Sequence, residues 1–195
     1  LTLRLIVRGE EIRRSYSICS SPLENEIRIA IKRVKDGKGS NFINENLKTG
    51  NEIEVMTPMG NFHSPMNASH KKKYALFAGG SGITPVFSII KTVLQTEPNS
   101  SLVLFYGNLN EETTIFKKQL DELAQQNPVR FKLNYIFDKP ALKVDELYKG
   151  VMTKDKVRTF FDKHINFPED NEFFICGPKP MMDNVRKTLE EKKIE

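Results

Sequence analysis

Residues 74–85 read Tyr-Ala-Leu-Phe-Ala-Gly-Gly-Ser-Gly-Ile-Thr-Pro, and this stretch decides the fold class of the 195-residue chain. Tyr74 to Ala78 is a continuous apolar run, which is typical of a strand buried on both faces. A glycine-rich segment follows, and from Pro85 to Leu94 apolar residues recur at helical spacing. A buried strand, a tight turn and a helix in this order predict an α/β sheet of mostly parallel strands.

The same alternation of strand and helix continues to the end of the chain. Apolar runs predict strands over residues 102–106, 131–137 and 172–176, and helical periodicity predicts helices over 113–126 and 179–192. We therefore predict a doubly wound, parallel-sheet domain over residues 74–195.

The N-terminal residues have a different rhythm, with short strands and few helices. Strands are predicted over residues 3–7, 14–20, 26–34 and 52–56, and one short helix over 40–47. This pattern favours an antiparallel β-barrel or sandwich over residues 1–66. The polar and basic residues 67–73 then read as a solvated linker between two domains.

Composition excludes several classes of protein. The chain has 38% hydrophobic and 28% charged residues, a balance typical of soluble globular proteins, and no apolar run reaches the length of a membrane helix. Its only cysteines, Cys19 and Cys176, are too few for a disulfide framework or a cysteine-ligated cluster, so we expect no metal site and a reducing, cytoplasmic location. Because the chain opens on Leu1 inside a strand-like segment, we expect its true N-terminus to be missing and find no signal peptide.

The net charge of +5 lies entirely within residues 1–75, and the rest of the chain is balanced. A basic half is compatible with nucleic-acid binding. However, the chain has no helix-turn-helix, zinc or RNP signature, so we expect neither a nucleic-acid nor a membrane partner.

In open α/β sheets, ligands bind beyond the carboxyl ends of the strands. Those ends carry glycine-rich or polar residues in this chain: Gly79 to Pro85, Gly107-Asn108, Asp138 and Gly177-Pro178. Glycines let backbone N–H groups approach a phosphate, and the following helix adds its positive N-terminal end. The loop departs from the usual dinucleotide fingerprint, since Pro85 stands where the last glycine is expected, and a tight turn without a ligand is the plain alternative.

The β-rich half contains a second candidate site. Arg14 and Tyr16 are two residues apart and so share one face of a strand. The arginine fork suits a diphosphate, and the tyrosine ring can stack on a flat heterocycle. Ser40 and Asn41 begin a helix after Gly39, which is another arrangement that binds anions. Taken singly, a tyrosine such as Tyr16 is more often a core aromatic residue, and an arginine such as Arg14 is more often a surface charge.

Together these motifs resemble the ferredoxin–NADP reductase superfamily, and they follow its order along nearly the whole chain. The resemblance rests on Arg14-Ser15-Tyr16-Ser17, Gly39-Ser40-Asn41, Gly79 to Pro85, Tyr106-Gly107-Asn108 and Cys176-Gly177-Pro178. It implies a truncated FAD-binding β-barrel, a NAD(P)-binding domain, and hydride transfer from NAD(P)H to FAD that needs no general base.

The resemblance also implies roles for single residues. Arg14 would hold the FAD diphosphate, Tyr16 would stack on the isoalloxazine, and Ser17 would hydrogen-bond near its N5. Backbone groups of Ser40 and Asn41 would bind phosphate. Gly80, Gly82 and Thr84 would cradle the nicotinamide dinucleotide, and Cys176 and Gly177 would lie beside the nicotinamide. Tyr16, Ser17 and Cys176 are therefore the predicted catalytic residues. Further cofactor contacts are expected at Ile31, Gly39, Phe62, Pro85, Tyr106, Gly107, Asn108, Pro178 and Met181.

Within the superfamily, residues 9–19 look most like the reductase components of multicomponent oxygenases, the phenylacetyl-CoA oxygenase type in particular. Such reductases carry a plant-type [2Fe–2S] ferredoxin domain, whose four-cysteine pattern this chain lacks. The expected partners are thus a ferredoxin-type iron–sulfur domain or protein and an oxygenase component. A stand-alone flavin or ferredoxin reductase is the alternative.

Three further expectations concern charged and titratable residues. Relatives often place Arg after Gly-Asn, where it meets a 2′-phosphate, but Leu109 stands at this position here. The sequence therefore favours NADH over NADPH. The preference is weak, because Lys117 or Lys118 offers a substitute for the arginine. His63, His70 and His164 lie outside the motifs and are expected at the surface. The remaining basic residues of the N-terminal half are expected to face an acidic electron-transfer partner: Arg4, Arg8, Lys32, Arg33, Lys35 and Lys38.

Overall fold

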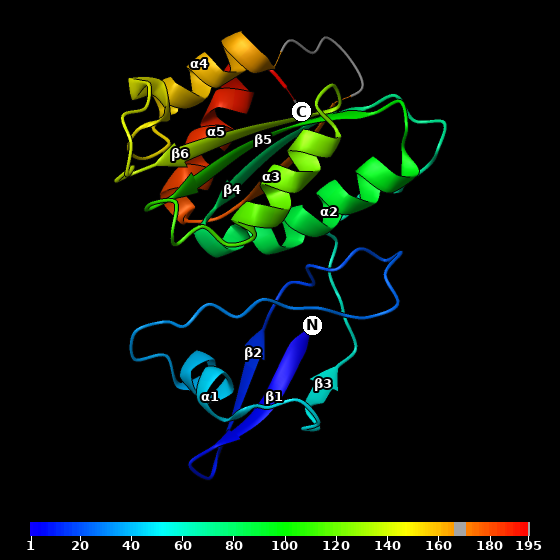
Figure 1. Ribbon diagram of the computed structural model, residues 1–195, viewed down its shortest axis with the longest axis vertical. Coiled ribbons are helices and arrows are strands. Elements are labelled where there is room, and N and C mark those ends of the chain that lie inside the picture. Colours follow the sequence, from blue (N-terminus) through cyan, green and yellow to red (C-terminus); the bar gives the residue numbers. More distant parts are fainter. Residues whose placement is uncertain (166–170, 195) are drawn as a thin grey trace.

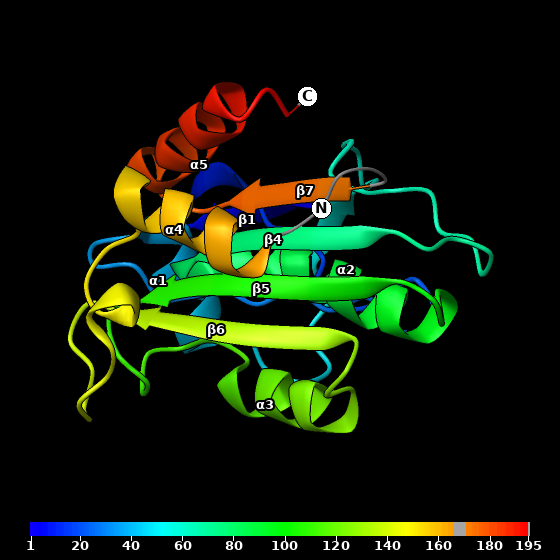
Figure 2. The same ribbon diagram turned by 90° about the horizontal axis from the view of Figure 1, so that it is seen from above.

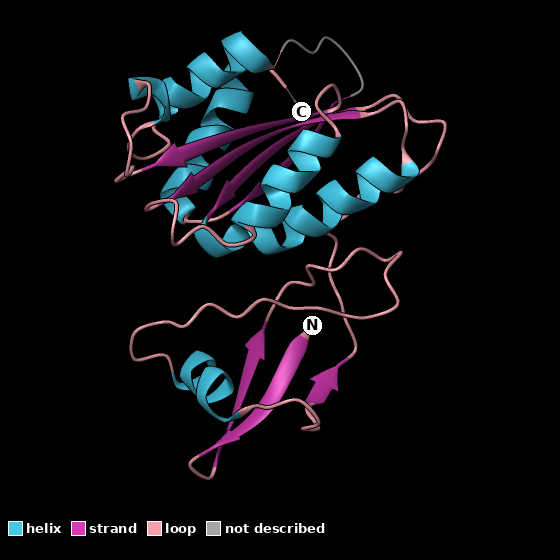
Figure 3. Cartoon of the chain, viewed as in Figure 1, coloured by secondary structure: helices cyan, strands magenta, loops and turns pink. Residues whose placement is uncertain are grey.

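The computed structural model describes residues 1–165 and 171–194. Figure 1 shows two lobes, a smaller β-rich lobe that contains the N-terminus and a larger lobe of helices around a sheet. Figure 3 shows how much of the smaller lobe is loop. Together they confirm the predicted combination of an antiparallel β-rich half and a parallel α/β half.

The β-rich lobe is built on an antiparallel sheet. Its strands are β1 (Thr2–Val7), β2 (Glu10–Ser15) and β3 (Glu54–Met56), in the order β2-β1-β3. Helix α1 (Lys38–Asn46) packs beside β1 and β2. Leu3 and Leu5 point to the buried face of β1, as the two-residue period of a strand requires.

The larger lobe contains a parallel sheet with the order β6-β5-β4-β7. Its elements are β4 (Lys73–Gly79), a 3₁₀ turn (Gly80–Gly82), α2 (Ile83–Thr96), β5 (Ser101–Asn108), α3 (Lys117–Gln126), β6 (Phe131–Phe137), a second 3₁₀ turn (Glu146–Tyr148), α4 (Lys154–His164), β7 (Asn171–Cys176) and α5 (Lys179–Glu191). Figure 2 shows the strands side by side in this order. From β4 the chain adds β5 and β6 on one side, and it then crosses back to place β7 on the other side of β4. The strand order therefore switches between β4 and β7, which is where such sheets bind ligands.

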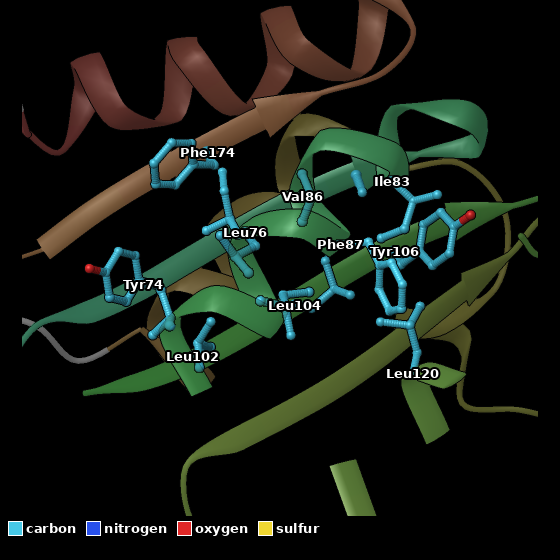
Figure 4. Packing of buried hydrophobic residues seen from close by; sticks show 14 of the residues in the cluster. Tyr74, Leu76, Ile83, Val86, Phe87, Leu102, Leu104, Tyr106, Leu120 and Phe174 are labelled. Atoms are coloured by element: carbon cyan, nitrogen blue, oxygen red, sulfur yellow. The ribbon is translucent and has the colours of Figure 1, made fainter. Parts of the chain in front are cut away.

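Side chains on the two faces of the sheet form separate cores. Tyr74, Leu76 and Ala78 pack against α2 and α3, while Ala75 and Phe77 pack against α4 and α5. Figure 4 shows the first of these cores, with Leu76 near Val86 of α2 and Tyr74 towards the other end of β4. This alternation within one apolar run explains why the central strands carry hardly any polar residue.

Several predicted boundaries are wrong. Among the described residues, the predicted strand over 26–34 forms a single β-bridge, between Ile18 and Ile29. A strand needs a hydrogen-bonding neighbour along its whole length, and this segment has such a neighbour only at Ile18. The predicted strand over 14–20 ends at Ser15. Helix α3 begins at Lys117 and not at 113, since Phe116 has a left-handed φ of 60°. Helix α2 begins at Ile83, which places Pro85 in the first turn, where no N–H partner is needed.

Helix α4 was not predicted, although its sequence carries the usual signals. Thr153 caps it by accepting a hydrogen bond from the Lys156 N–H at 3.4 Å. Val157, Phe160 and Phe161 are buried at helical spacing. Within the described ranges, the structure has no helix long and apolar enough to cross a membrane.

The predicted solvated linker and two of the predicted surface histidines are also corrected. Lys73 belongs to β4 and Lys72 forms an ion pair with Glu172. His63 is exposed, but His70 Nδ1 lies 2.8 Å from Oε1 of the buried Glu97. His164 Nε2 lies 2.9 Å from the Tyr148 hydroxyl. These contacts arise from residues distant in sequence, so residue type alone did not reveal them.

Candidate cofactor site

A cavity of about 860 Å³ lies at the junction of the two lobes. One wall is the end of β2 and the start of α1, and the other is formed by the carboxyl ends of β4 and β7. The strand register brings these ends together, since Gly79 pairs with Gly107 and Ala78 with Cys176. Most of the predicted site residues line it: Arg14, Tyr16, Ser17, Gly39, Ser40, Gly80, Gly82, Thr84, Cys176, Gly177 and Pro178.

The glycine-rich loop is packed tightly against the end of β7. A Cβ built on Gly82 would lie 2.1 Å from the backbone oxygen of Cys176, so no side chain fits at position 82. Gly80 has a φ of +53°, and a Cβ there would point into open space. The loop backbone is therefore bare on its cavity side, which is what close approach of a phosphate requires.

Hydrogen bonds hold the loop in this shape. The Thr84 hydroxyl donates to the Ser81 carbonyl at 3.0 Å, and the buried Tyr106 hydroxyl donates to the Gly80 carbonyl at 2.9 Å. Helix α2 begins immediately after the loop, so its positive end lies at the cavity, although the Ile83 N–H already donates to carbonyls of the loop. Tyr106 thus fixes the loop through the Gly80 carbonyl and does not line the cavity.

The opposite wall is rich in positive charge. Arg14, Lys32 and Lys38 line the cavity, and among its described lining residues none is acidic. Lys38 also pairs with Glu10 at 2.9 Å. Ser40 is buried in the first turn of α1, and its hydroxyl accepts a hydrogen bond from the Val34 N–H at 3.2 Å. A cavity with this charge is suited to an anionic ligand such as a diphosphate.

Tyr16 and Cys176 present neutral groups to the cavity from opposite lobes. The Tyr16 N–H donates to the Leu1 carbonyl at 2.8 Å, which fixes Tyr16 just beyond the end of β2. Burial raises the pKa of the Tyr16 phenol, against a smaller opposing effect of Arg14. Burial also raises the pKa of the Cys176 thiol. Both groups therefore stay protonated at neutral pH, and neither is a charged base.

The other predicted site residues lie around this cavity. Phe62 and Pro85 line a neighbouring hollow, and Asn41 lines another beside α1. Met181 is buried against the glycine-rich loop, and Gly107 faces Met152. Asn108 ends β5, where its carbonyl accepts from the Asp138 N–H at 3.0 Å. The remaining predicted residue, Ile31, does not line the cavity, whereas its neighbours Ala30 and Lys32 do.

Some lining residues were missed or given another role. Lys32 and Lys38 were predicted to face a partner protein, yet both belong to the cavity wall. The two-residue alternation of Ala30, Lys32 and Val34 was the available signal, because all three line the cavity. Two of the other basic residues predicted to dock a partner are ion-paired within the lobe, Arg4 with Glu11 and Glu54, and Arg33 with Glu45.

The residues present fit a flavin and a nicotinamide dinucleotide. The Oδ1 atom of Asn41 is buried and has no hydrogen-bond partner among the described residues. Buried polar atoms are nearly always paired, so a ligand group beside α1 that donates a hydrogen bond, such as a hydroxyl or N–H, would satisfy it. On the other wall, Gly80 leaves the loop backbone open to a phosphate of the nucleotide.

Comparisons with known proteins agree with this geometry. Residues 1–64 match the family model of the oxidoreductase FAD-binding domain, and residues 76–187 match that of the oxidoreductase NAD-binding domain. The chain is 40% identical over 189 residues to one of the subunits of 1,2-phenylacetyl-CoA epoxidase from Escherichia coli K12, covering 97% of this chain and 53% of that protein.

A second relative, the ferredoxin reductase component of 3-ketosteroid-9-alpha-monooxygenase from Rhodococcus rhodochrous, is 36% identical over 191 residues, or 97% of this chain and 50% of that one. The chain thus spans about half the length of these curated relatives. Among solved structures, the cytochrome b5 reductase domain of Ulva prolifera nitrate reductase superposes with a TM-score of 0.81 at 25% identity, over 100% of this chain and 79% of that one. The chain belongs to the ferredoxin–NADP reductase family of FAD- and NAD-binding oxidoreductases.

Proposed function

We propose that this chain is the flavin- and nucleotide-binding part of a reductase that passes electrons from NAD(P)H through FAD to a ferredoxin-type iron–sulfur centre. The observation that carries the proposal is the single cavity at which Tyr16 and Arg14 of one lobe face Gly80 and Cys176 of the other. When bound, FAD supplies the chemistry that accepts a hydride and releases electrons singly.

The chain's own residues orient the two cofactors and bind their phosphates. Arg14 and Lys32 provide fixed positive charge on the flavin side, and Gly80 with the start of α2 provides N–H groups on the nucleotide side. Tyr16 offers an uncharged ring, and Cys176 a small uncharged thiol. In this proposal residues 1–66 bind FAD, 67–73 connect the lobes, and 74–195 bind NAD(P)H, although 166–170 and 195 lie outside the described residues.

The electron acceptor is proposed to be an iron–sulfur centre carried outside these residues. A plant-type cluster needs four cysteine ligands, and the chain has two cysteines, both free thiols. Similarity to the E. coli epoxidase protein supports an oxygenase component as the final partner. Free thiols fit the reducing cytoplasm as the location.

We further propose that NADH is preferred to NADPH. Leu109 is 47% exposed beyond β5, where it offers no charge to a 2′-phosphate. Lys117 Nζ is held at 2.7 Å from the Asp121 carboxylate and lies over the Tyr135 ring. Lys117 is therefore already engaged by a carboxylate of its own helix, which weakens the alternative that it replaces an arginine.

Reconstitution with FAD tests the proposal. The protein is mixed with FAD, its absorbance spectrum is recorded after removal of free flavin, and NADH and a plant-type ferredoxin are added in turn. We expect a bound flavin band that NADH bleaches and ferredoxin restores. Failure to bind FAD, or failure of both NADH and NADPH to bleach the bound flavin, contradicts the reductase activity. Bleaching by NADPH but not by NADH contradicts only the coenzyme preference, and bleaching without restoration contradicts only the acceptor.

A further inference from the structure

Residues 20–24 join the β-rich lobe to helix α2 through three polar contacts. The Ser88 hydroxyl donates to the Ser20 carbonyl at 2.6 Å, and the Ser21 and Thr92 hydroxyls lie 2.9 Å apart. Lys91 forms an ion pair with Glu24. The contacts on α2 come from positions 88, 91 and 92, which share one face of the helix. We call these contacts the interlobe latch.

The latch is buried and its geometry is closely defined. Ser20 and Ser21 are each 2% exposed and Thr92 is 6% exposed. The Glu24 carboxylate also accepts a hydrogen bond from the Ser21 N–H at 3.0 Å. Cys19 is 5% exposed and belongs to the hydrophobic cluster that α2 forms with the parallel sheet. A short segment of one lobe is thus embedded in the other, so the two lobes do not meet merely as surfaces.

The latch lines the neighbouring hollow and is connected along the chain to both walls of the cofactor cavity. Its first residue, Ser20, follows Ser17 closely, and helix α2 begins directly after Gly82. Figure 1 shows α2 on the side of the larger lobe that faces the smaller one. Residues 20–24 lead back to Tyr16 and α2 leads back to the glycine-rich loop, so the docking of this segment on α2 is one of the contacts that hold the two cavity walls at a fixed separation.

We propose that Lys91 and Glu24 are positioning residues that set the separation of the flavin-binding and nucleotide-binding walls. This inference rests on the proposed function, in which a hydride crosses that gap. Transfer rates depend steeply on the separation of the reacting atoms, and a displacement of about 1 Å can cost about a hundredfold. The pair therefore affects rate more than its modest contribution to folding stability would indicate.

Replacing Lys91 with methionine tests the inference, because methionine retains an apolar stem over the Phe87 ring while removing the charge. In the FAD-loaded protein we expect Lys91→Met to lower the rate of flavin reduction at saturating NADH by about tenfold, with the NADH dissociation constant within about twofold. Lys91→Arg, which keeps the charge, should restore most of the rate.

Lys192→Met is the matched control. Lys192 Nζ pairs with Asp162 at 2.7 Å and lies over the Phe161 ring, as Lys91 lies over Phe87. It is on the other side of the sheet, at the end of α5, far from the latch in the fold. An equal loss of rate in Lys192→Met, or a wild-type rate in Lys91→Met, overturns the inference.

A second measurement needs no cofactor. Hydrogen exchange of the cofactor-free protein, followed by mass spectrometry, should show faster exchange in peptides covering residues 18–25 in Lys91→Met, but not in Lys192→Met. Unchanged exchange in these peptides also overturns the latch. If the wild-type protein binds no FAD, the proposed function fails, and the exchange result still decides whether the latch couples the lobes.

Discussion

The backbone of Gly82 lies directly against the carbonyl group of Cys176, so closely that a Cβ at position 82 would come within 2.1 Å of the oxygen. These residues end the glycine-rich loop and strand β7, and both line the cofactor cavity. Their contact closes the nucleotide side of the cavity and ties the shape of the loop to the position of the Cys176 thiol.

Gly82→Ala should therefore damage the nucleotide side of the site. The added methyl group forces the loop away from β7, at a cost of about 1–3 kcal/mol in stability. We expect the Michaelis constant for NADH to rise by at least about tenfold, since each 1.4 kcal/mol lost in binding is tenfold. FAD affinity, measured by quenching of flavin fluorescence, should change little. A wild-type Michaelis constant would show that the loop does not bind the nucleotide.

Arg14→Met should weaken FAD binding. Hydrogen bonds to charged groups contribute about 1.5–3 kcal/mol, so we expect the FAD dissociation constant to rise by about 10- to 100-fold. Arg13→Met provides the control, because Arg13 is on the same strand, pairs with Glu11 at 3.0 Å and does not line the cavity. Equal effects of the two substitutions would assign Arg14 only a general electrostatic role.

Leu109→Arg should change the coenzyme preference. A guanidinium group beyond β5 can form paired hydrogen bonds with a 2′-phosphate. We expect kcat/KM for NADPH to rise by about tenfold, with that for NADH changed by less than about threefold. Lys118→Met is the control. The Lys118 side chain is 87% exposed and its Nζ lies 3.9 Å from Glu122 Oε1, so its charge is not needed for folding. A large loss of NADPH activity in Lys118→Met would mean that Lys118 already binds the phosphate.

Stability should fall in acid because of Glu97, which is fully buried. Burial by itself raises the pKa of this carboxyl, but hydrogen bonds from Ser100, His70, the Asn67 N–H and Tyr74 outweigh burial and lower it below its ordinary value of 4.5. A lowered pKa stabilises the fold fully above the unfolded-state pKa, and this contribution is lost as the pH falls through the lower, folded-state pKa.

Denaturant unfolding from pH 7 to pH 3 measures this effect. Glu97→Gln should lower the free energy of unfolding at pH 7 by about 1–3 kcal/mol and should flatten its decline in acid. Glu122→Gln, at a carboxyl that is 54% exposed, should leave both nearly unchanged. The explanation fails if the acid profile of Glu97→Gln matches that of the wild-type protein.

The parallel sheet was predictable because its signals are local. The strand predicted over 131–137 coincides with β6, and the run from Tyr74 to Ala78 lies within β4. A strand buried on both faces must be apolar throughout, whatever its neighbours are. The prediction of a strand over 26–34 was wrong for the opposite reason. Alternation of apolar and polar residues indicates which side chains share a face, but it does not show whether a neighbouring strand is present to form the hydrogen bonds.

By itself, the sequence determined the order of the elements and the residue types at each strand end, including the glycine-rich loop and the Arg14-to-Ser17 motif. Only the tertiary structure decided that Lys32 lines the cavity, that Gly82 abuts Cys176, and that Glu24 docks on α2. The physical reason is that periodicity reports which side of its own element a residue occupies, whereas contacts between distant residues depend on how complete lobes pack.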